Sequence, residues 1–158
     1  RGLISETQFL GSLQLRCRPG TTLAQVQDAW NAVLIGPRPD ILPVLKSLSG
    51  SHDLLLFSNT NSIHAAHFEQ KILGTLGKAF HESFRQVVYS HRLGERKPNP
   101  EAFEQVTRQC GLDPESVLFI DDTRDNITAA RHAGWNAVYH NPEDHTFQEL
   151  FRRLDYPI

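Results

Sequence analysis

Residues 117–122 read Val-Leu-Phe-Ile-Asp-Asp, four apolar residues followed directly by two carboxylates. A short, uninterrupted apolar run is typical of a strand that is buried on both faces of a parallel sheet. Similar runs are found at residues 53–57, 86–89 and 135–139. Helical patterns separate or follow these runs, at residues 62–73, 100–110, 125–133 and 146–154. Strands that alternate with helices predict an α/β fold, with a doubly wound parallel sheet covered by helices on both faces.

In the N-terminal third of the chain, the sequence patterns predict only helices. Residues 5–8 (Ser-Glu-Thr-Gln) fit a capping box, and apolar residues follow them at helical spacing. Residues 22–25 (Thr-Leu-Ala-Gln) repeat this pattern at the start of a second helix, which Gly36 should end. A third helix is expected from about residue 39 to residue 48.

Composition limits the classes of function. Hydrophobic residues make up 39% of the 158 residues and charged residues 22%, which indicates a globular chain. A formal net charge of -2 argues against a strongly basic nucleic-acid binder, and no apolar run approaches the roughly 20 residues of a membrane helix. The two cysteines, Cys17 and Cys110, are far apart in sequence. We interpret them as reduced, buried thiols of a cytoplasmic protein.

The carboxylates at residues 121 and 122 indicate a metal. In a sheet of this kind, ligands bind at the carboxyl ends of the strands. Asp121 and Asp122 lie at such an end, and adjacent carboxylates repel each other unless a cation neutralises them. Oxygen ligands suit Mg²⁺, and Asn126 is placed to contact a metal-bound water. The alternative is that Asp122 or Asp125 only caps the helix that follows.

Polar residues also follow two other predicted strands. Ser58 and Asn59 offer a hydroxyl group and backbone N–H groups at a strand-to-helix turn, where a phosphate oxygen can be held. An ordinary turn, with Asn61 as a helix cap, is the alternative. Lys97 lies in a loop that Pro98 stiffens, and from there it could pair with a phosphate and with a carboxylate. A lysine of this kind could equally be solvated.

These three loops together resemble motifs two, three and four of the haloacid dehalogenase-like hydrolase superfamily. The family order is Ser/Thr-Asn after one strand, Lys-Pro after the next and Asp-Asp after the third. The matching strings are Leu-Phe-Ser-Asn-Thr-Asn at 56–61, Leu-Gly-Glu-Arg-Lys-Pro-Asn-Pro-Glu at 93–101, and Leu-Phe-Ile-Asp-Asp-Thr-Arg-Asp-Asn-Ile-Thr-Ala-Ala-Arg at 118–131.

The resemblance extends to the N-terminal helices. Residues 1–36 resemble the later part of the helical cap that the superfamily inserts after its first strand, so that residues 37–158 form the Rossmann-like core. Residues 29–32 (Ala-Trp-Asn-Ala) are similar to the cap of subfamily IA. That subgroup contains bacterial glucose-1-phosphate phosphatases and the N-terminal phosphatase domain of soluble epoxide hydrolases.

The resemblance implies a Mg²⁺-dependent phosphatase of small phosphorylated metabolites, such as sugar phosphates. In this mechanism an aspartate on the first strand attacks phosphorus, and a second aspartate two residues later protonates the leaving group and then activates water. By motif position, Asp122 is the direct metal ligand. Asp121 and Asn126 support the waters on the metal.

The same resemblance assigns the substrate contacts. Ser58 and Asn59 are expected to hold the phosphoryl group, and Lys97 to bridge it to the nucleophile. Trp30 and Asn31, in the cap, are the candidates for contacts with the rest of the substrate. Packing in the core of the cap is the alternative for Trp30.

The first motif, an apolar strand that ends in Asp-x-Asp, does not occur in this sequence, which also contains no methionine. We therefore expect the working protein to include an N-terminal segment of roughly 30–50 residues, which corresponds to one strand and the first cap helix. In the superfamily's sheet the missing strand is central. We expect an open slot between the strands of Leu55 and Phe119, which should not pair with each other.

Three other functions compete with an enzyme of this type. A pseudo-phosphatase would have lost the catalytic strand and kept a phosphate-binding pocket with a regulatory role. A phosphoacceptor receiver domain uses similar residues, but it places its acidic pair before the lysine, whereas Lys97 precedes Asp121. A metal-free dehalogenase would leave the acidic pair without a neutralising cation, which is costly when the pair is buried.

Overall fold

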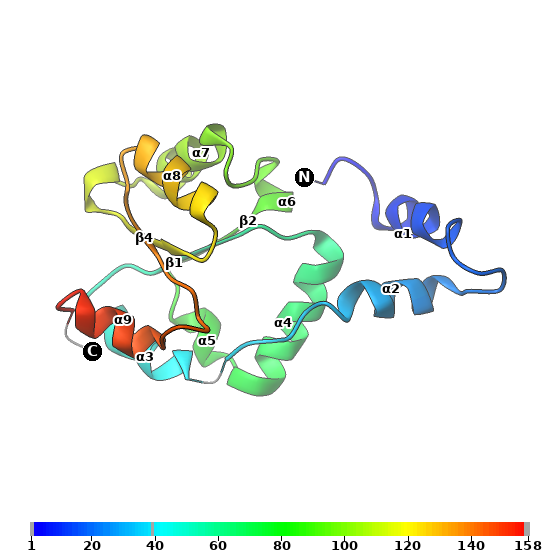
Figure 1. Cartoon of the computed structure of the whole chain (residues 1–158), viewed down its shortest axis with the longest axis horizontal. Coiled ribbons are helices and arrows are strands. Elements are labelled where there is room, and N and C mark those ends of the chain that lie inside the picture. Colours follow the sequence, from blue (N-terminus) through cyan, green and yellow to red (C-terminus); the bar gives the residue numbers. More distant parts are fainter. Residues whose placement is uncertain (1, 39, 157–158) are drawn as a thin grey trace.

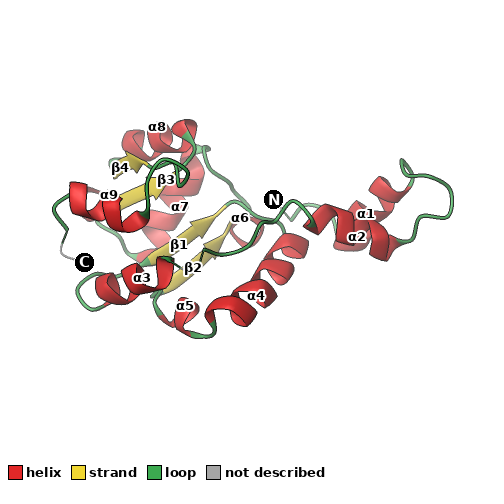
Figure 2. Cartoon of the chain, turned by 60° about the horizontal axis from the view of Figure 1, so that its bottom comes forward, coloured by secondary structure: helices red, strands yellow, loops and turns green. Residues whose placement is uncertain are grey.

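The computed structural model describes residues 2–38 and 40–156. Strand β1 (Leu55–Ser58) pairs in parallel with β2 (Gln86–Tyr89), and β3 (Leu118–Asp121) pairs in parallel with β4 (Asn136–Tyr139). Within the described residues no ladder joins β1 to β3, so the strands form two half-sheets (Figure 2). The α/β fold with parallel strands is confirmed, and so is the expectation that the strands of Leu55 and Phe119 do not pair.

Helices cover both faces of these half-sheets. One face packs on α7 (Pro100–Cys110) and α8 (Arg124–His132), through a core that contains Phe103, Phe119 and Trp135. The opposite face packs on α3 (Ile41–Ser49), α4 (Ser62–Leu76), α5 (Ala79–Glu82) and α9 (Phe147–Arg153). Two short elements, α6 (Ser90–Leu93) and the 3₁₀ helix η1 (Pro114–Ser116), complete the connections (Figure 1). This two-sided burial explains why the central residues of each strand are apolar, with polar residues only at the strand ends.

The N-terminal helices form a hairpin that projects from this body (Figure 2). Both α1 (Glu6–Gln14) and α2 (Leu23–Asn31) begin with the predicted capping boxes. The hairpin buries Leu10 and Val26 against Ile63, near the start of α4. The cap-like part of the chain is therefore attached to the body through the first turns of α4.

Several predicted boundaries were wrong. Helix α2 ends at Asn31 rather than at Gly36, because Val33 and Ile35 are exposed and give the helix no further packing. Helix α3 begins at Ile41, and residue 39, where we expected its start, lies outside the described residues. Helix α5 forms in a stretch for which no regular helix was predicted.

The prediction for the cysteines holds for only one of them. Cys110, at the end of α7, is buried in the core with Phe103 and Trp135, whereas Cys17 is exposed after α1. Among the described residues, no helix is both long enough and apolar enough to cross a membrane.

Candidate functional site

Lys97 lies where the loops after β1, β2 and β3 meet. Its side chain is only 7% exposed, and its Nζ donates to the carbonyl oxygen of Phe57 and to Oδ2 of Asp121, each at 2.7 Å. The ammonium group also lies 4.9 Å from the ring centre of Phe57 and 5.1 Å from that of Phe119. One buried cation therefore bridges the carboxyl ends of the two half-sheets.

The side chain of Asn59 fixes the Lys97 loop. Its Nδ2 donates to the carbonyl oxygen of Lys97 at 2.8 Å, and its Oδ1 accepts from the backbone N–H of Lys97 at 3.0 Å. Both ends of the amide are thus occupied by the backbone of the lysine. The family motif predicted a direct contact of Asn59 with the phosphoryl group, whereas this geometry makes its side chain a positioning group and leaves its backbone N–H for a phosphate.

The side chain of Ser90 likewise holds the backbone of another loop, and Ser90 was not among the predicted site residues. Its hydroxyl group accepts from the N–H of Thr60 and donates to the carbonyl oxygen of Thr60, both at 2.9 Å. Ser90 is buried and begins α6 directly after β2. The contacts of Ser90 join the loop after β1 to the loop after β2. The sequence signal that could have identified it is a small hydroxyl residue directly after a predicted strand.

Asp121 and Asp122 have different surroundings. Asp121 is buried and accepts from Lys97, from the N–H of Thr123 at 2.8 Å and from Nδ2 of Asn126 at 2.9 Å. Burial raises the pKa of Asp121, but the hydrogen bond and charge of Lys97, with the donors of Asn126 and Thr123, outweigh burial and lower it. Asp122 is exposed and has one long contact, 3.5 Å from the hydroxyl of Thr123.

These contacts correct the inference from the sequence that the adjacent carboxylates of Asp121 and Asp122 need a metal ion to neutralise them. Lys97 neutralises Asp121, and Asp122 is solvated, so the acidic pair does not by itself require a metal ion. The residues nevertheless fit Mg²⁺, which binds through one or two carboxylates and keeps several waters. The carboxylate of Asp122 is free for such a role. The described residues contain no cluster of three or more His, Cys, Asp or Glu side chains that could hold a metal without further ligands.

His140 follows β4 at the same edge of the fold. It is 5% exposed, its ring packs against Phe147, and its backbone N–H donates to the carbonyl oxygen of Asp121 at 3.0 Å. Burial, with the positive charges of His145 and Arg38, lowers the pKa of His140, although Asp144 and Asp122 act in the opposite direction. His140 is therefore a neutral packing residue at neutral pH.

The remaining candidates are Ser58, at the edge of this cluster, and Trp30 and Asn31 in the cap. Ser58 ends β1, half-buried, next to Asn59. Trp30 packs between Phe9 and His64, with ring centres 4.8 and 5.0 Å apart, so its ring belongs to the core of the cap. Within the described part of the chain, Nε1 of Trp30 and Oδ1 of the buried Asn31 have no hydrogen-bond partner.

The clamp of Asn59 gives a testable prediction. Asn59→Ala leaves the N–H and C=O groups of Lys97 unpaired, and it should lower the free energy of unfolding by about 1–3 kcal/mol in urea denaturation. Asn99→Ala is the matched control, because Asn99 lies in the same loop and its side chain donates to that of Glu95 rather than to the backbone of Lys97. The control should lose about 0.5 kcal/mol or less. Equal losses in the two variants would contradict the clamp.

A family model for haloacid dehalogenase-like hydrolases matches residues 6–134, which include both helices of the cap and the loops described above. The chain belongs to this family. A haloacid dehalogenase family enzyme from Bacteroides thetaiotaomicron, crystallised with magnesium and inorganic phosphate, superposes with a TM-score of 0.88 at 27% identity. That superposition covers 96% of this chain and 76% of the other.

Curated relatives include enzymes of two kinds. An (S)-2-haloacid dehalogenase from a Pseudomonas strain is 27% identical over 148 residues, covering 93% of this chain and 61% of the relative. A D-ribitol-5-phosphate phosphatase from Bacteroides thetaiotaomicron is 25% identical over 134 residues, covering 85% of this chain and 65% of the relative. The chain thus spans somewhat less than two thirds of the length of these two relatives.

Proposed function

We propose that the working protein is a cytoplasmic, Mg²⁺-dependent phosphatase of small phosphorylated metabolites, with sugar phosphates as the substrate class. The observation that carries this proposal is the buried Lys97, held at the ends of β1 and β3, with an exposed carboxylate on the residue after its ion-pair partner. Transfer of a phosphoryl group is catalysed by fixed positive charges, and here a buried ammonium group lies beside a carboxylate that is available to bind a metal ion. The phosphatase among the relatives and the phosphate-bound neighbour support the same class.

In this proposal, different residues of the chain bind the metal ion, bind the phosphoryl group and stabilise the transition state. Asp122 would hold Mg²⁺, which would neutralise charge on the phosphoryl oxygens, and Asp121 and Asn126 would accept from or donate to waters around it. The hydroxyl group of Ser58 and the backbone N–H of Asn59 bind phosphoryl oxygens. The ammonium group of Lys97 stabilises the charge that develops in the transition state.

The nucleophile belongs, in this proposal, to a segment before residue 1. A carboxylate oxygen of that segment attacks phosphorus, the bond from phosphorus to the ester oxygen breaks, and a second carboxyl group protonates the leaving alcohol. Water then attacks the aspartyl-phosphate and releases inorganic phosphate. Trp30 and Asn31 are the proposed contacts for the alcohol part of the substrate, through the unpartnered Nε1 and Oδ1 atoms.

A metal-free dehalogenase is the second candidate, and one observation favours it. Lys97 already neutralises Asp121, so the acidic pair is accommodated without a metal ion. A haloacid dehalogenase is also among the relatives. The exposed Asp122, whose side chain makes only a long contact with Thr123 among the residues that the structure describes, favours the phosphatase.

A paired assay separates these functions. The protein with its N-terminal segment is given a panel of phosphate monoesters and a panel of 2-haloacids, each with Mg²⁺ and with EDTA. We expect phosphate release that EDTA abolishes and Mg²⁺ restores, and no halide release. Halide release that is insensitive to EDTA would make the protein a dehalogenase. Phosphate binding with no turnover of any ester would make it a pseudo-phosphatase.

A further inference from the structure

A half-buried histidine joins the cap, the hairpin of α1 and α2, to the start of α4. The end of α2 lies beside the first turn of α4 (Figure 1). There the imidazole ring of His64 stacks on the indole ring of Trp30, with ring centres 5.0 Å apart and planes inclined by 23°. Nε2 of the same imidazole lies 3.0 Å from the carbonyl oxygen of Trp30. His64 has no part in the reaction proposed above, so these contacts call for another role.

The carbonyl oxygen of Trp30 is one that its own helix cannot satisfy. The last four carbonyl groups of a helix have no partner within that helix, and α2 ends at Asn31. A histidine can donate to such a carbonyl and interacts favourably with the helix dipole. Here the histidine comes from another helix, 34 residues away in the sequence. Because a carbonyl oxygen only accepts, the contact requires a proton on Nε2 of His64 and leaves Nδ1 of the neutral ring without one.

The backbone of His64 is tied to the phosphate-binding loop, residues 58–61. The side chain of Asn61 caps α4 by accepting from the backbone N–H of His64 at 2.9 Å. Two residues earlier, the amide of Asn59 holds both backbone groups of Lys97. His64 therefore lies where the segment that positions the buried ammonium group meets the cap.

His64 also completes the surroundings of Trp30. The indole ring has a second aromatic neighbour, Phe9 of α1, at 4.8 Å and an angle of 68°. The residue after Trp30, Asn31, is buried, and its Oδ1 has no hydrogen-bond partner among the described residues. Trp30 and Asn31 are the proposed contacts for the alcohol part of the substrate. Their position relative to the phosphate-binding loop is therefore set in part by His64.

We propose that His64 is a positioning residue that fixes the cap against the phosphate-binding loop. It caps the C-terminus of α2 and stacks on Trp30, and it thereby sets the affinity for the alcohol part of the phosphate ester. The effect on affinity rests on the function proposed above, whereas the anchoring of the cap does not. A residue that only packs the interface would change stability without discriminating between the alcohol part and the phosphate.

Three substitutions of His64 separate its hydrogen bond from its stacking. In the protein with its N-terminal segment, His64→Ala removes both contacts and should raise KM for the preferred phosphate ester about tenfold. His64→Phe keeps the stacking and His64→Gln keeps a donor, so each should raise KM about threefold. The inhibition constant of inorganic phosphate should stay unchanged, because the phosphate-binding loop and Lys97 are intact.

His67→Ala is the matched control for these kinetics. His67 lies one turn further along α4 and does not take part in the contacts with Trp30, so KM should stay unchanged. An equal rise in KM and in the inhibition constant of phosphate in His64→Ala would make His64 a general packing residue and overturn the proposal.

The anchoring of the cap is measured without turnover. Nitrogen NMR spectra of the histidine side chains at alkaline pH, with His64 assigned from the signals missing in His64→Phe, should show the proton on Nε2. Hydrogen exchange in His64→Ala should be about tenfold faster at residues 6–31 and unchanged at residues 100–132. A proton on Nδ1, or unchanged exchange at residues 6–31, would overturn the proposal. So would faster exchange throughout the chain in both His64→Ala and His64→Gln, because the loss would then be one of global stability.

Failure of the proposed function gives a different result from failure of this inference. If no phosphate ester is turned over, the function is refuted, and the tautomer and the exchange at residues 6–31 decide whether His64 anchors the cap. If an ester is turned over but KM is the same in His64→Ala and His67→Ala, the function stands and the role of His64 in affinity is refuted.

Discussion

Lys97→Ala should lower the rate of phosphate release by about 100-fold or more, because a preorganised cation is removed from the developing charge of the transition state. Steady-state kinetics with a phosphate monoester and saturating Mg²⁺ measures this loss, which should appear in kcat. Arg96→Ala is the matched control. Arg96 is the preceding residue of the same loop, but it is exposed, and its replacement should leave kcat unchanged.

The same substitution should also destabilise the fold. The family resemblance assigned Lys97 only to the phosphoryl group and the nucleophile, but the structure buries the Lys97–Asp121 pair, each side chain being 7% exposed. Removal of one partner of a buried ion pair typically costs about 3–5 kcal/mol. Lys97→Met combined with Asp121→Asn should recover most of that stability and none of the activity. If the double variant regained activity, Lys97 would be a structural residue only.

Asp122→Asn should abolish Mg²⁺-dependent phosphate release while leaving the fold intact. A negatively charged ligand of a hard cation is lost, whereas the exposed side chain contributes little to stability, about 0.5 kcal/mol or less. Activity is measured across a Mg²⁺ titration, and stability by urea denaturation. Full activity at ordinary Mg²⁺ concentrations would remove Asp122 from the metal site.

Asp121→Asn is the companion to that experiment. Its effect on activity should be milder than that of Asp122→Asn, because the family resemblance assigns Asp121 to a metal-bound water rather than to the metal itself. The structure adds a second consequence, since the buried Asp121 accepts from Lys97, Thr123 and Asn126. Asp121→Asn should therefore lose stability as well as some activity. Identical stability in the Asp121 and Asp122 variants would contradict this division of roles.

Local signals predicted the elements that depend on local chemistry. Strand β2 and helix α7 have the bounds that the sequence predicted. Pro100 begins α7, and Gly111 ends it in a left-handed conformation with φ of 62°, as a C-terminal glycine should. The three Ser/Thr-x-x-Gln/Glu capping boxes formed for the same reason. Each signal involves residues within about four positions of one another.

The candidate site was only half predictable, because its contacts join loops far apart in sequence. The motifs placed Asn59, Lys97 and Asp121 at one edge of the sheet. They did not reveal that the Asn59 amide would pair with the backbone of Lys97, 38 residues away. They also did not reveal that Lys97, rather than a metal ion, would neutralise Asp121. The spacing of residues in the sequence does not show which of the several polar groups at the strand ends will form hydrogen bonds with one another.

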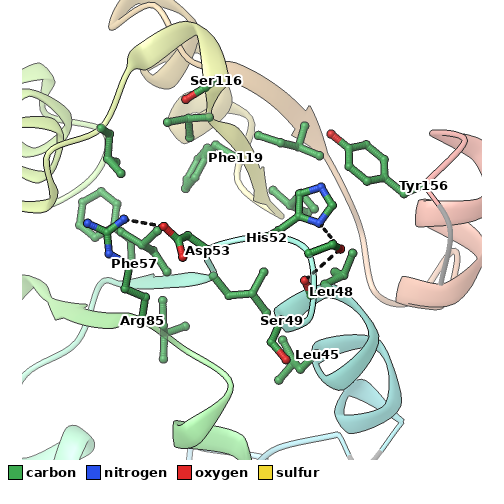
Figure 3. Close-up of a pocket in the computed structure, with 18 of the residues that line it drawn as sticks. Leu45, Leu48, Ser49, His52, Asp53, Phe57, Arg85, Ser116, Phe119 and Tyr156 are labelled. Atoms are coloured by element: carbon green, nitrogen blue, oxygen red, sulfur yellow. Dashed lines mark hydrogen bonds and ion pairs between the residues drawn. The ribbon is translucent and has the colours of Figure 1, made fainter.

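The open slot was predictable for a different reason. It followed from the order of strands that the superfamily resemblance implied, and the structure accordingly forms two pairs of strands rather than one sheet. Apart from Ser49 in α3, the side chains that line the cavity between β1 and β3 from α3, α7 and α9 are apolar, which suits a buried strand (Figure 3).

The location of the metal and the phosphate tests the account most directly. Crystals of the protein with its N-terminal segment would be grown with Mn²⁺, as an anomalous scatterer in place of Mg²⁺, and with inorganic phosphate. We predict an anomalous peak at bonding distance from a carboxylate oxygen of Asp122, with phosphate between this peak and Nζ of Lys97. A Mn²⁺ peak away from Asp122, or phosphate bound without contact to Lys97, would contradict the account.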